Sequence, residues 1–187
     1  DEGAGQYLHM AGWHTGYETV VGRMAGSSGE YRLDGGQGWM EHLRLGEGAG
    51  SQGTFVWSGG NMDVMNLHIG QGGTGHFIQD TGPGNGLYLQ PFQNMVIGEQ
   101  AGSEGVFEQR SGYVDTWGAH IIVGESGHGT YLQRDGYHGD SDIVIGHLIG
   151  SEGVYELSGE FANHHTQETI VGGAGTGRYI LSGEFAN

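Results

Sequence analysis

The sequence predicts an all-β protein: a single parallel β-solenoid of about eight coils that spans residues 1–187. Three observations predict it. A glycine followed two positions later by an aromatic residue recurs at a spacing of about 24 residues, each unit also holds a β-branched run closed by glycine, and 42 of the 187 residues are glycine. A fixed period of this length is typical of repeat architectures, in which each unit buries its apolar face against its neighbours.

The Gly-x-aromatic motif predicts the first strand of each repeat. Successive motif glycines lie 24 residues apart, except around Gly75, where the two steps are 22 and 30. Alternation along a strand places the aromatic residue and the residue two positions later on one face, and we expect that face to point inward. The predicted interior aromatic ladder runs through Tyr7, Tyr31, Phe55, Phe77, Phe107, Tyr131, Tyr155 and Tyr179.

A second interior ladder is expected two residues after the aromatic one, where leucine and glutamine predominate. We expect buried glutamines there to hydrogen-bond along the axis to the same residue of the next coil, as amide ladders do in stacked sheets. Glutamines that face solvent are the alternative. The members of this ladder are Leu33, Gln79, Gln109, Gln133, Leu157 and Leu181.

The second strand of each repeat is predicted by a β-branched run that ends at glycine, such as Val20–Gly22 or Ile122–Gly124. Valine and isoleucine bounded by glycine are typical of strands and turns. Helices are not expected, because the longest stretch without glycine covers only residues 160–171. A glycine inside a helix costs about 1 kcal/mol relative to alanine.

One repeat is longer than the others. The unit between Gly75 and Gly105 contains both prolines of the chain, Pro83 and Pro91, and it predicts a corner insertion near residues 81–91. Loops inserted at the corners of a solenoid often form its binding face. A tolerated surface bulge is the alternative interpretation.

Composition excludes several classes of function. The chain has no cysteine and no lysine, so it offers no disulfide, thiol nucleophile, thiolate metal site or Schiff base. Its net charge of −16 predicts that nucleic acid and anionic membrane surfaces are repelled. No apolar stretch is long enough to span a bilayer, so membrane insertion is not expected.

The last residues of the sequence repeat the preceding unit, since Leu157–Asn163 recurs as Leu181–Asn187. Terminal coils without a cap expose unpaired strand edges. The sequence is then either a segment of a longer repeat protein or a subunit that stacks head-to-tail on copies of itself, a contact that produces filaments when it does not close. The residues expected at the assembly ends are Gly5, Tyr7, Gly12, Leu181, Gly183, Phe185 and Asn187.

Units such as Ile145–Gly159 resemble the glycine-rich β-strand repeats of secreted bacterial surface proteins, including autotransporter passenger-like β-solenoids. The resemblance covers essentially the whole chain. It implies a β-solenoid fold, an extracellular location at the cell surface and a structural or adhesive role. It implies no catalytic residues.

Two groups of side chains have the chemistry for a site. His138, Asp140 and Asp142 alternate along one predicted strand, and we expect them to share a face on which an imidazole and two carboxylates would bind calcium or another divalent cation. A solvated loop is the alternative. Arg110 and Arg134 occupy equivalent positions of adjacent units, where they form either a catalytic pair or a surface ladder balanced by carboxylates.

The remaining aromatic residues decide between two further interpretations. If they are exposed, they would stack on sugar rings, and if they point inward, they belong to the core. These residues are Trp13, Trp39, Trp117, Tyr113 and Tyr137.

We therefore expect a non-enzymatic extracellular structural protein that requires no cofactor, a subunit or segment of a surface fibre assembled head-to-tail from copies of itself. A polysaccharide-binding adhesin module that uses the loop of residues 81–86 and exposed aromatic residues is the alternative. A polysaccharide-cleaving enzyme is the third interpretation, because it would need a basic cluster and the arginines of this chain are scattered.

Overall fold

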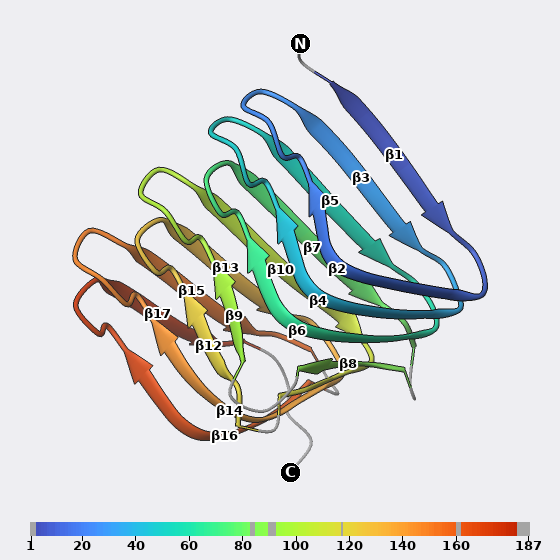
Figure 1. Cartoon of the computed structure of the whole chain (residues 1–187). Helices are drawn as coiled ribbons and strands as arrows, with labels where there is room; N and C mark the ends of the chain where they lie inside the picture. The colour runs from blue at the N-terminus through green and yellow to red at the C-terminus, as the bar shows by residue number, and fades with distance from the viewer. Residues whose placement is uncertain (1–2, 83–84, 90–92, 117, 160–161, 183–187) are drawn as a thin grey trace.

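A computed structural model describes residues 3–82, 85–116 except 90–92, 118–159 and 162–182, apart from the side chains at 88, 89 and 140. The predicted fold class is confirmed. Within the described residues every regular element is a strand, every strand pairing is parallel, and the chain winds through about seven turns of a β-solenoid (Figure 1).

Two parallel sheets pack across one shared core. The first sheet contains the Gly-x-aromatic strands, which follow one another in chain order: β1 (Ala4–His9), β3 (Ser28–Leu33), β5 (Gln52–Trp57), β7 (Thr74–Asp80), β10 (Glu104–Ser111), β13 (His128–Gln133), β15 (Glu152–Leu157) and β17 (Thr176–Leu181). The second sheet contains β2 (Trp13–Val21), β4 (Gln37–Leu45), β6 (Asn61–Ile69), β8 (Gly86–Leu89), β9 (Asn94–Ile97), β11 (Tyr113–Asp115), β12 (His120–Val123), β14 (Tyr137–Ile145) and β16 (Asn163–Val171).

Each coil consists of one first-sheet strand and the second-sheet strand or strand pair that follows it. Coil 1 is β1 and β2, coils 2 and 3 are β3–β4 and β5–β6, and coils 4 and 5 each split their second-sheet strand in two, as β8 with β9 and β11 with β12. Coils 6 and 7 are β13–β14 and β15–β16, and β17 starts the eighth. Figure 1 shows the coils stacked with β1 at one end of the molecule and β17 at the other.

The motif aromatics stack in register inside the first sheet. Ring centroids of neighbouring coils lie 4.7 Å apart for Tyr31 and Phe55, 5.0 Å for Phe55 and Phe77, and 4.6 Å for Tyr131 and Tyr155. These distances follow from the strand spacing of about 4.8 Å in a sheet. The rings from Tyr31 to Tyr155 are buried, whereas Tyr179 is half-buried.

The motif position requires glycine because backbone atoms of another strand lie too close to leave room for a Cβ. It does not require glycine because of a positive φ angle. A Cβ on Gly105 would lie 2.1 Å from the carbonyl oxygen of Ile69, and a Cβ on Gly153 would lie 2.1 Å from that of Val123. A Cβ on Gly5, in coil 1, would meet nothing within 4 Å. The restriction therefore comes from the ends of earlier second-sheet strands, which pack beneath the glycine.

The long repeat places its extra residues in coil 4, around β8 and β9. At its start, Asn85 Nδ2 donates to the carbonyl oxygen of Thr81 (2.9 Å), and the backbone N–H of Gly82 donates to Ser111 Oγ (2.9 Å). Pro83 and Pro91 lie outside the described residues. The insertion is thus bonded at its base to the neighbouring coil.

Candidate functional site

The interior of coils 6 and 7 contains a buried network of polar side chains. The Tyr155 hydroxyl donates to Gln133 Oε1 (2.8 Å) and lies 2.9 Å from His138 Nδ1, while Ser141 Oγ lies 3.1 Å from His138 Nε2. An Nδ1–H tautomer of a neutral imidazole satisfies all three contacts. Burial, followed by the nearby His164, lowers the pKa of His138 well below its usual value. The network therefore consists of neutral side chains that satisfy one another's hydrogen bonds in the core. This arrangement indicates a structural role and not acid–base chemistry.

The expectation that His138 and Asp142 share one face is wrong. His138 is fully buried, whereas Asp142 is exposed enough for its carboxylate to lie 3.6 Å from His120 Nδ1 on the outside. The pairing of β14 with β16 shifts register between Gly139 and Asp142, so simple alternation fails there. The side chain of Asp140 lies outside the described ones. We therefore do not propose the divalent-cation site, and the described residues hold no cluster of three or more His, Asp or Glu side chains suited to a metal.

The glutamines of the second interior ladder are buried, but they do not bond to one another as expected. Gln109 Nε2 donates to the carbonyl oxygen of Tyr137 (3.0 Å) and Gln133 Nε2 to that of Asn163 (2.8 Å). Their amide oxygens accept instead from the tyrosine hydroxyls of the next coil. The reason is their position near the end of a first-sheet strand, where the carbonyl oxygen of the first residue of a second-sheet strand lies within reach of the amide N–H.

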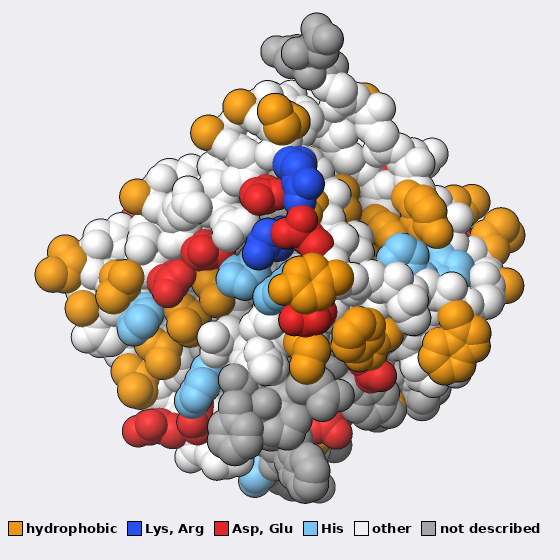
Figure 2. Space-filling view, viewed as in Figure 1, with side chains coloured by type: hydrophobic (Ala, Val, Ile, Leu, Met, Phe, Trp, Pro, Cys, Tyr) orange, Lys and Arg blue, Asp and Glu red, His pale blue; other side chains and the backbone are white. Residues whose placement is uncertain are grey.

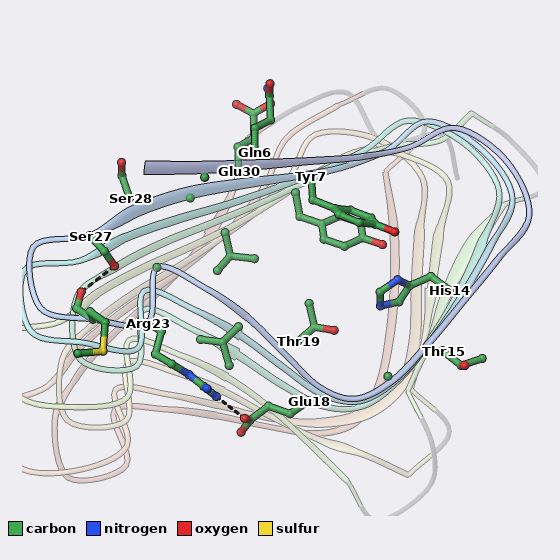
Figure 3. A pocket seen from close by; sticks show the side chains of 18 residues that line it. Gln6, Tyr7, His14, Thr15, Glu18, Thr19, Arg23, Ser27, Ser28 and Glu30 are labelled. Carbon is green, nitrogen blue, oxygen red and sulfur yellow. Dashed lines mark hydrogen bonds and ion pairs between the residues drawn. The ribbon is translucent and has the colours of Figure 1, made fainter. Parts of the chain in front are cut away.

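The N-terminal end of the stack is hollow. A cavity of about 680 Å³ opens there, and Figure 3 shows the side chains of Tyr7 and His14 directed into it. It exists because Gly16 and Thr19 stand where coil 2 has the larger Met40 and Leu43.

Two polar atoms around this cavity lack partners among the described residues. They are the hydroxyl of Tyr31, a residue that is 4% exposed, and Nε2 of His14. Burial raises the pKa of Tyr31 and, together with His9, depresses that of His14. Coil 2 therefore leaves unsatisfied a tyrosine hydroxyl of the kind that has a hydrogen-bond partner at Tyr131, Tyr155 and Tyr179.

The predicted assembly ends that the structure describes are accessible. Tyr7 is 49% exposed and Leu181 is 59% exposed, and both Gly5 and Gly12 are exposed. Among the described residues, the outer edges of β1 and β17 have no strand partner. Gly183, Phe185 and Asn187 lie outside the described residues.

Three of the aromatic residues considered for sugar stacking are exposed on the second sheet. Trp13 is 75% exposed, Trp39 37% and Tyr137 39%. Tyr113 is half-buried, and Trp117 lies outside the described residues.

Sequence reasoning did not single out Tyr17, which is 69% exposed. Its spacing of four residues from Trp13 along the same strand is the signal that identifies it, because alternation places both on one face. Trp57, in contrast, is fully buried and donates its indole N–H to the carbonyl oxygen of Gly59 (2.9 Å).

The arginine pair of adjacent units converges on one carboxylate. Glu108 accepts hydrogen bonds from Arg110 (2.8 Å) and from Arg134 (2.9 Å). Burial alone would raise the pKa of Glu108, but the two guanidinium groups outweigh it and the net pKa is lowered. This arrangement is a surface ladder balanced by a carboxylate.

A second ionic group lies on the face shown in Figure 2, where basic side chains gather among acidic ones. Glu18 pairs there with both Arg23 and Arg44, which belong to successive coils. These pairs are largely solvent-exposed, so their contribution to stability is small.

Comparison with protein-family models, with curated proteins and with solved structures finds no match for this chain. The described part of the chain contains no helix long and apolar enough to cross a membrane.

Proposed function

We propose that this chain is a structural building element of an extracellular fibre or surface appendage, in which solenoids stack head-to-tail through the edges of β1 and β17. The observation that carries the proposal is that a strand with the same Gly-x-Tyr motif lies at each end of the stack. Gly5 and Tyr7 on β1 match Gly177 and Tyr179 on β17, and both strand edges lack a partner among the described residues.

The contact between two copies would have the same strand pairing and ring stacking as the contact between two coils inside one copy. Tyr155 and Tyr179 stack with their ring centroids 5.2 Å apart across a parallel strand pair whose glycines are in register. A copy placed so that its Tyr7 follows Tyr179 would continue the ladder with the same geometry. Because the two surfaces differ, the contact is heterologous and extends without closing.

The ends also carry the apolar surface that such a contact needs. Tyr7 and Leu8 are about half exposed at one end, and Ile170, Val171 and Leu181 are 40%, 48% and 59% exposed at the other. Exposed strand edges with apolar side chains are templates for pairing with another chain. Burial of this surface against a copy supports the proposed stacking.

Electron microscopy and sedimentation velocity at neutral pH test the proposal, with calcium and with a chelator. We expect thin unbranched filaments, and added salt or calcium should favour them because the net charge of −16 opposes association. Discrete particles at every protein concentration and salt condition would contradict head-to-tail stacking.

A substitution at one end tests whether filaments grow by contact between two different ends of the molecule. The Tyr7→Lys variant should place a charge in the stacking surface and abolish filaments on its own. It keeps a normal β17 edge, so a small fraction mixed into the unmodified protein should cap growing ends and shorten the filaments. Tyr137→Lys, on the outer face of coil 6, is the matched control and should leave filament length unchanged.

We propose a non-enzymatic role, and two observations support it. Arg110 and Arg134 are both engaged by Glu108, so this pair is not free to bind an acidic substrate. At the base of the corner insertion, Thr81 and Asn85 bond to each other's carbonyl oxygens (3.3 and 2.9 Å), so their polar groups are already used. The extracellular location is proposed from the resemblance to secreted surface repeats.

A further inference from the structure

Three exposed aromatic side chains gather on the outer face of coils 1 and 2. We name Trp13, Tyr17 and Trp39 the aromatic patch; they are 75%, 69% and 37% exposed. Figure 2 shows hydrophobic side chains standing beside acidic ones over this part of the second sheet. Large aromatic rings left in solvent are the exception in a folded protein and mark interaction sites when they cluster.

The exposure of the patch is not merely an end effect. Trp39 belongs to coil 2, which has a coil on each side, and its rung neighbours are Thr15 and Asp63 rather than other rings. The rings therefore do not continue a stack like the one in the interior. Among the described residues the indole N–H groups of Trp13 and Trp39 have no hydrogen-bond partner, so both remain available.

The surroundings of the rings are polar and can hydrogen-bond. Trp13 shares its rung with Gln37 and Asn61, and Trp39 shares its rung with Asp63. Sheet spacings place Trp13 and Trp39, one rung and two residues apart, at about 8 Å from each other on the outer face. Burial raises the pKa of Asp63, which is consistent with partial shielding of this carboxyl from water.

We propose that the aromatic patch binds a neutral polysaccharide. The apolar C–H faces of sugar rings stack on exposed indole and phenol rings, while amides and carboxylates beside them accept and donate to sugar hydroxyls. The acidic surface of the protein disfavours uronic-acid and sulfated polymers, which selects the neutral class. This binding role is independent of the proposed stacking, because the patch faces outward and not along the axis.

The test uses the full chain and six-residue oligosaccharides of β-1,4-linked glucose, β-1,4-linked N-acetylglucosamine and α-1,4-linked glucose, with oligogalacturonate as the acidic probe. Tryptophan emission and titration calorimetry report binding. At least one neutral oligosaccharide should shift the emission, and oligogalacturonate should not. Trp13→Ala and Trp39→Ala should each weaken binding about tenfold or more, as expected for truncation of a central aromatic contact.

Ile149→Ala is the matched control, because Ile149 is 89% exposed at a corner of coil 6 and far along the axis from the patch. It should bind like the unmodified chain. Filament formation should be the same in Trp13→Ala and Trp39→Ala as in the unmodified protein, which separates this proposal from the stacking one. No response to any neutral oligosaccharide at millimolar concentration would overturn the proposal, and so would unchanged affinity of both tryptophan variants.

Discussion

The central coils and the C-terminal coils fill the same interior space in different ways. In coils 3 to 5 the ladder consists of Phe55, Phe77 and Phe107, and the facing second-sheet positions are apolar: Met62, Leu87 and Val114. In coils 6 to 8 the ladder consists of Tyr131, Tyr155 and Tyr179, and the facing positions that follow Val114 are His138 and His164. The backbone spacing is the same in both regions.

In coils 3 to 8 a tyrosine is placed where the preceding coil supplies a hydrogen-bond partner, whereas Tyr31 in coil 2 has no such partner among the described residues. The Tyr131 hydroxyl donates to Gln109 Oε1 (3.2 Å), and that of Tyr179 lies 2.7 Å from His164 Nδ1. Phe77 follows Trp57, whose only polar group is already bonded to a backbone carbonyl. A buried hydroxyl without a partner is costly, so the choice between Phe and Tyr follows the neighbouring coil.

One rung departs from this rule. Gln79 in coil 4 is followed by Phe107, which has no hydroxyl, and Gln79 Oε1 has no partner among the described residues. The rule can be tested here by the substitution Phe107→Tyr, which adds one hydroxyl group next to Gln79.

The largest expected effect tests the close packing of the motif glycine, which the two regions share. Gly105→Ala in the centre and Gly153→Ala near the C-terminus should both lower the free energy of unfolding by more than about 3 kcal/mol, because each Cβ would clash with backbone. Gly5→Ala should be nearly neutral, since nothing lies within 4 Å of its Cβ. Chemical denaturation measures all three, and tolerance of alanine at Gly105 would refute the close-approach argument.

The next effect tests the rule itself. Tyr155→Phe should cost about 1–3 kcal/mol, because it leaves Gln133 Oε1 without its tyrosine donor inside the core. Phe107→Tyr should raise stability by about 1 kcal/mol by supplying a donor to Gln79, whereas Phe77→Tyr should lower it. Thermal and urea unfolding compare the three variants, and equal destabilisation by both Phe→Tyr changes would contradict the rule.

A pH titration of stability sharpens the comparison further. Burial, followed by the nearby His165, lowers the pKa of His164 to about 4. The unfolded chain, with a histidine pKa of about 6.5, binds the proton more readily. Stability from this group is therefore complete above about pH 6.5 and decreases as the pH falls toward 4.

The expected loss between pH 7 and pH 5 is about 1 kcal/mol after allowance for partial exposure. His164→Gln should flatten the profile by that amount. An identical pH profile of stability for His164→Gln and the unmodified chain would show that protonation of His164 does not destabilise the folded state.

The smallest effect concerns the surface between the two regions. Glu108→Gln removes the carboxylate that links Arg110 and Arg134 and should cost about 1 kcal/mol, less at high salt. Asp34→Asn, in a more exposed pair with Arg32, should cost less than Glu108→Gln. Unfolding measured at low and at high salt distinguishes the two.

The sequence predicts the solenoid because its two strongest signals have direct physical causes. The motif glycine repeats because an earlier strand end packs against it, and the aromatic residue repeats because its ring stacks on the next coil. Both contacts recur at the same position of successive coils, so they leave a regular period in the chain.

The predictions that failed depend on contacts between non-equivalent positions. Gln133 bonds to Tyr155 and to the carbonyl of Asn163, not to another glutamine, and no repeat period reveals that pairing. The inward position of His138 with Asp142 outside depends on an irregularity in the pairing of β14 with β16. The exposure of Trp13 and Trp39 is one of two alternatives that the sequence leaves open, because alternation defines two faces without saying which one is exposed to solvent. Tyr17 is not among the residues that the sequence analysis identifies.

Among the described residues, each strand of the first sheet pairs only with the strands one coil away, so none of these pairings spans the length of the molecule. In such a nearest-neighbour array the free energy of folding grows with the number of coils, and no particular number is preferred. Opening begins most easily at an end and proceeds by fraying, one coil at a time. Duplication or deletion of a whole 24-residue unit, such as the one that separates Gly129 from Gly153, changes the length of the molecule and leaves the rest of its architecture intact.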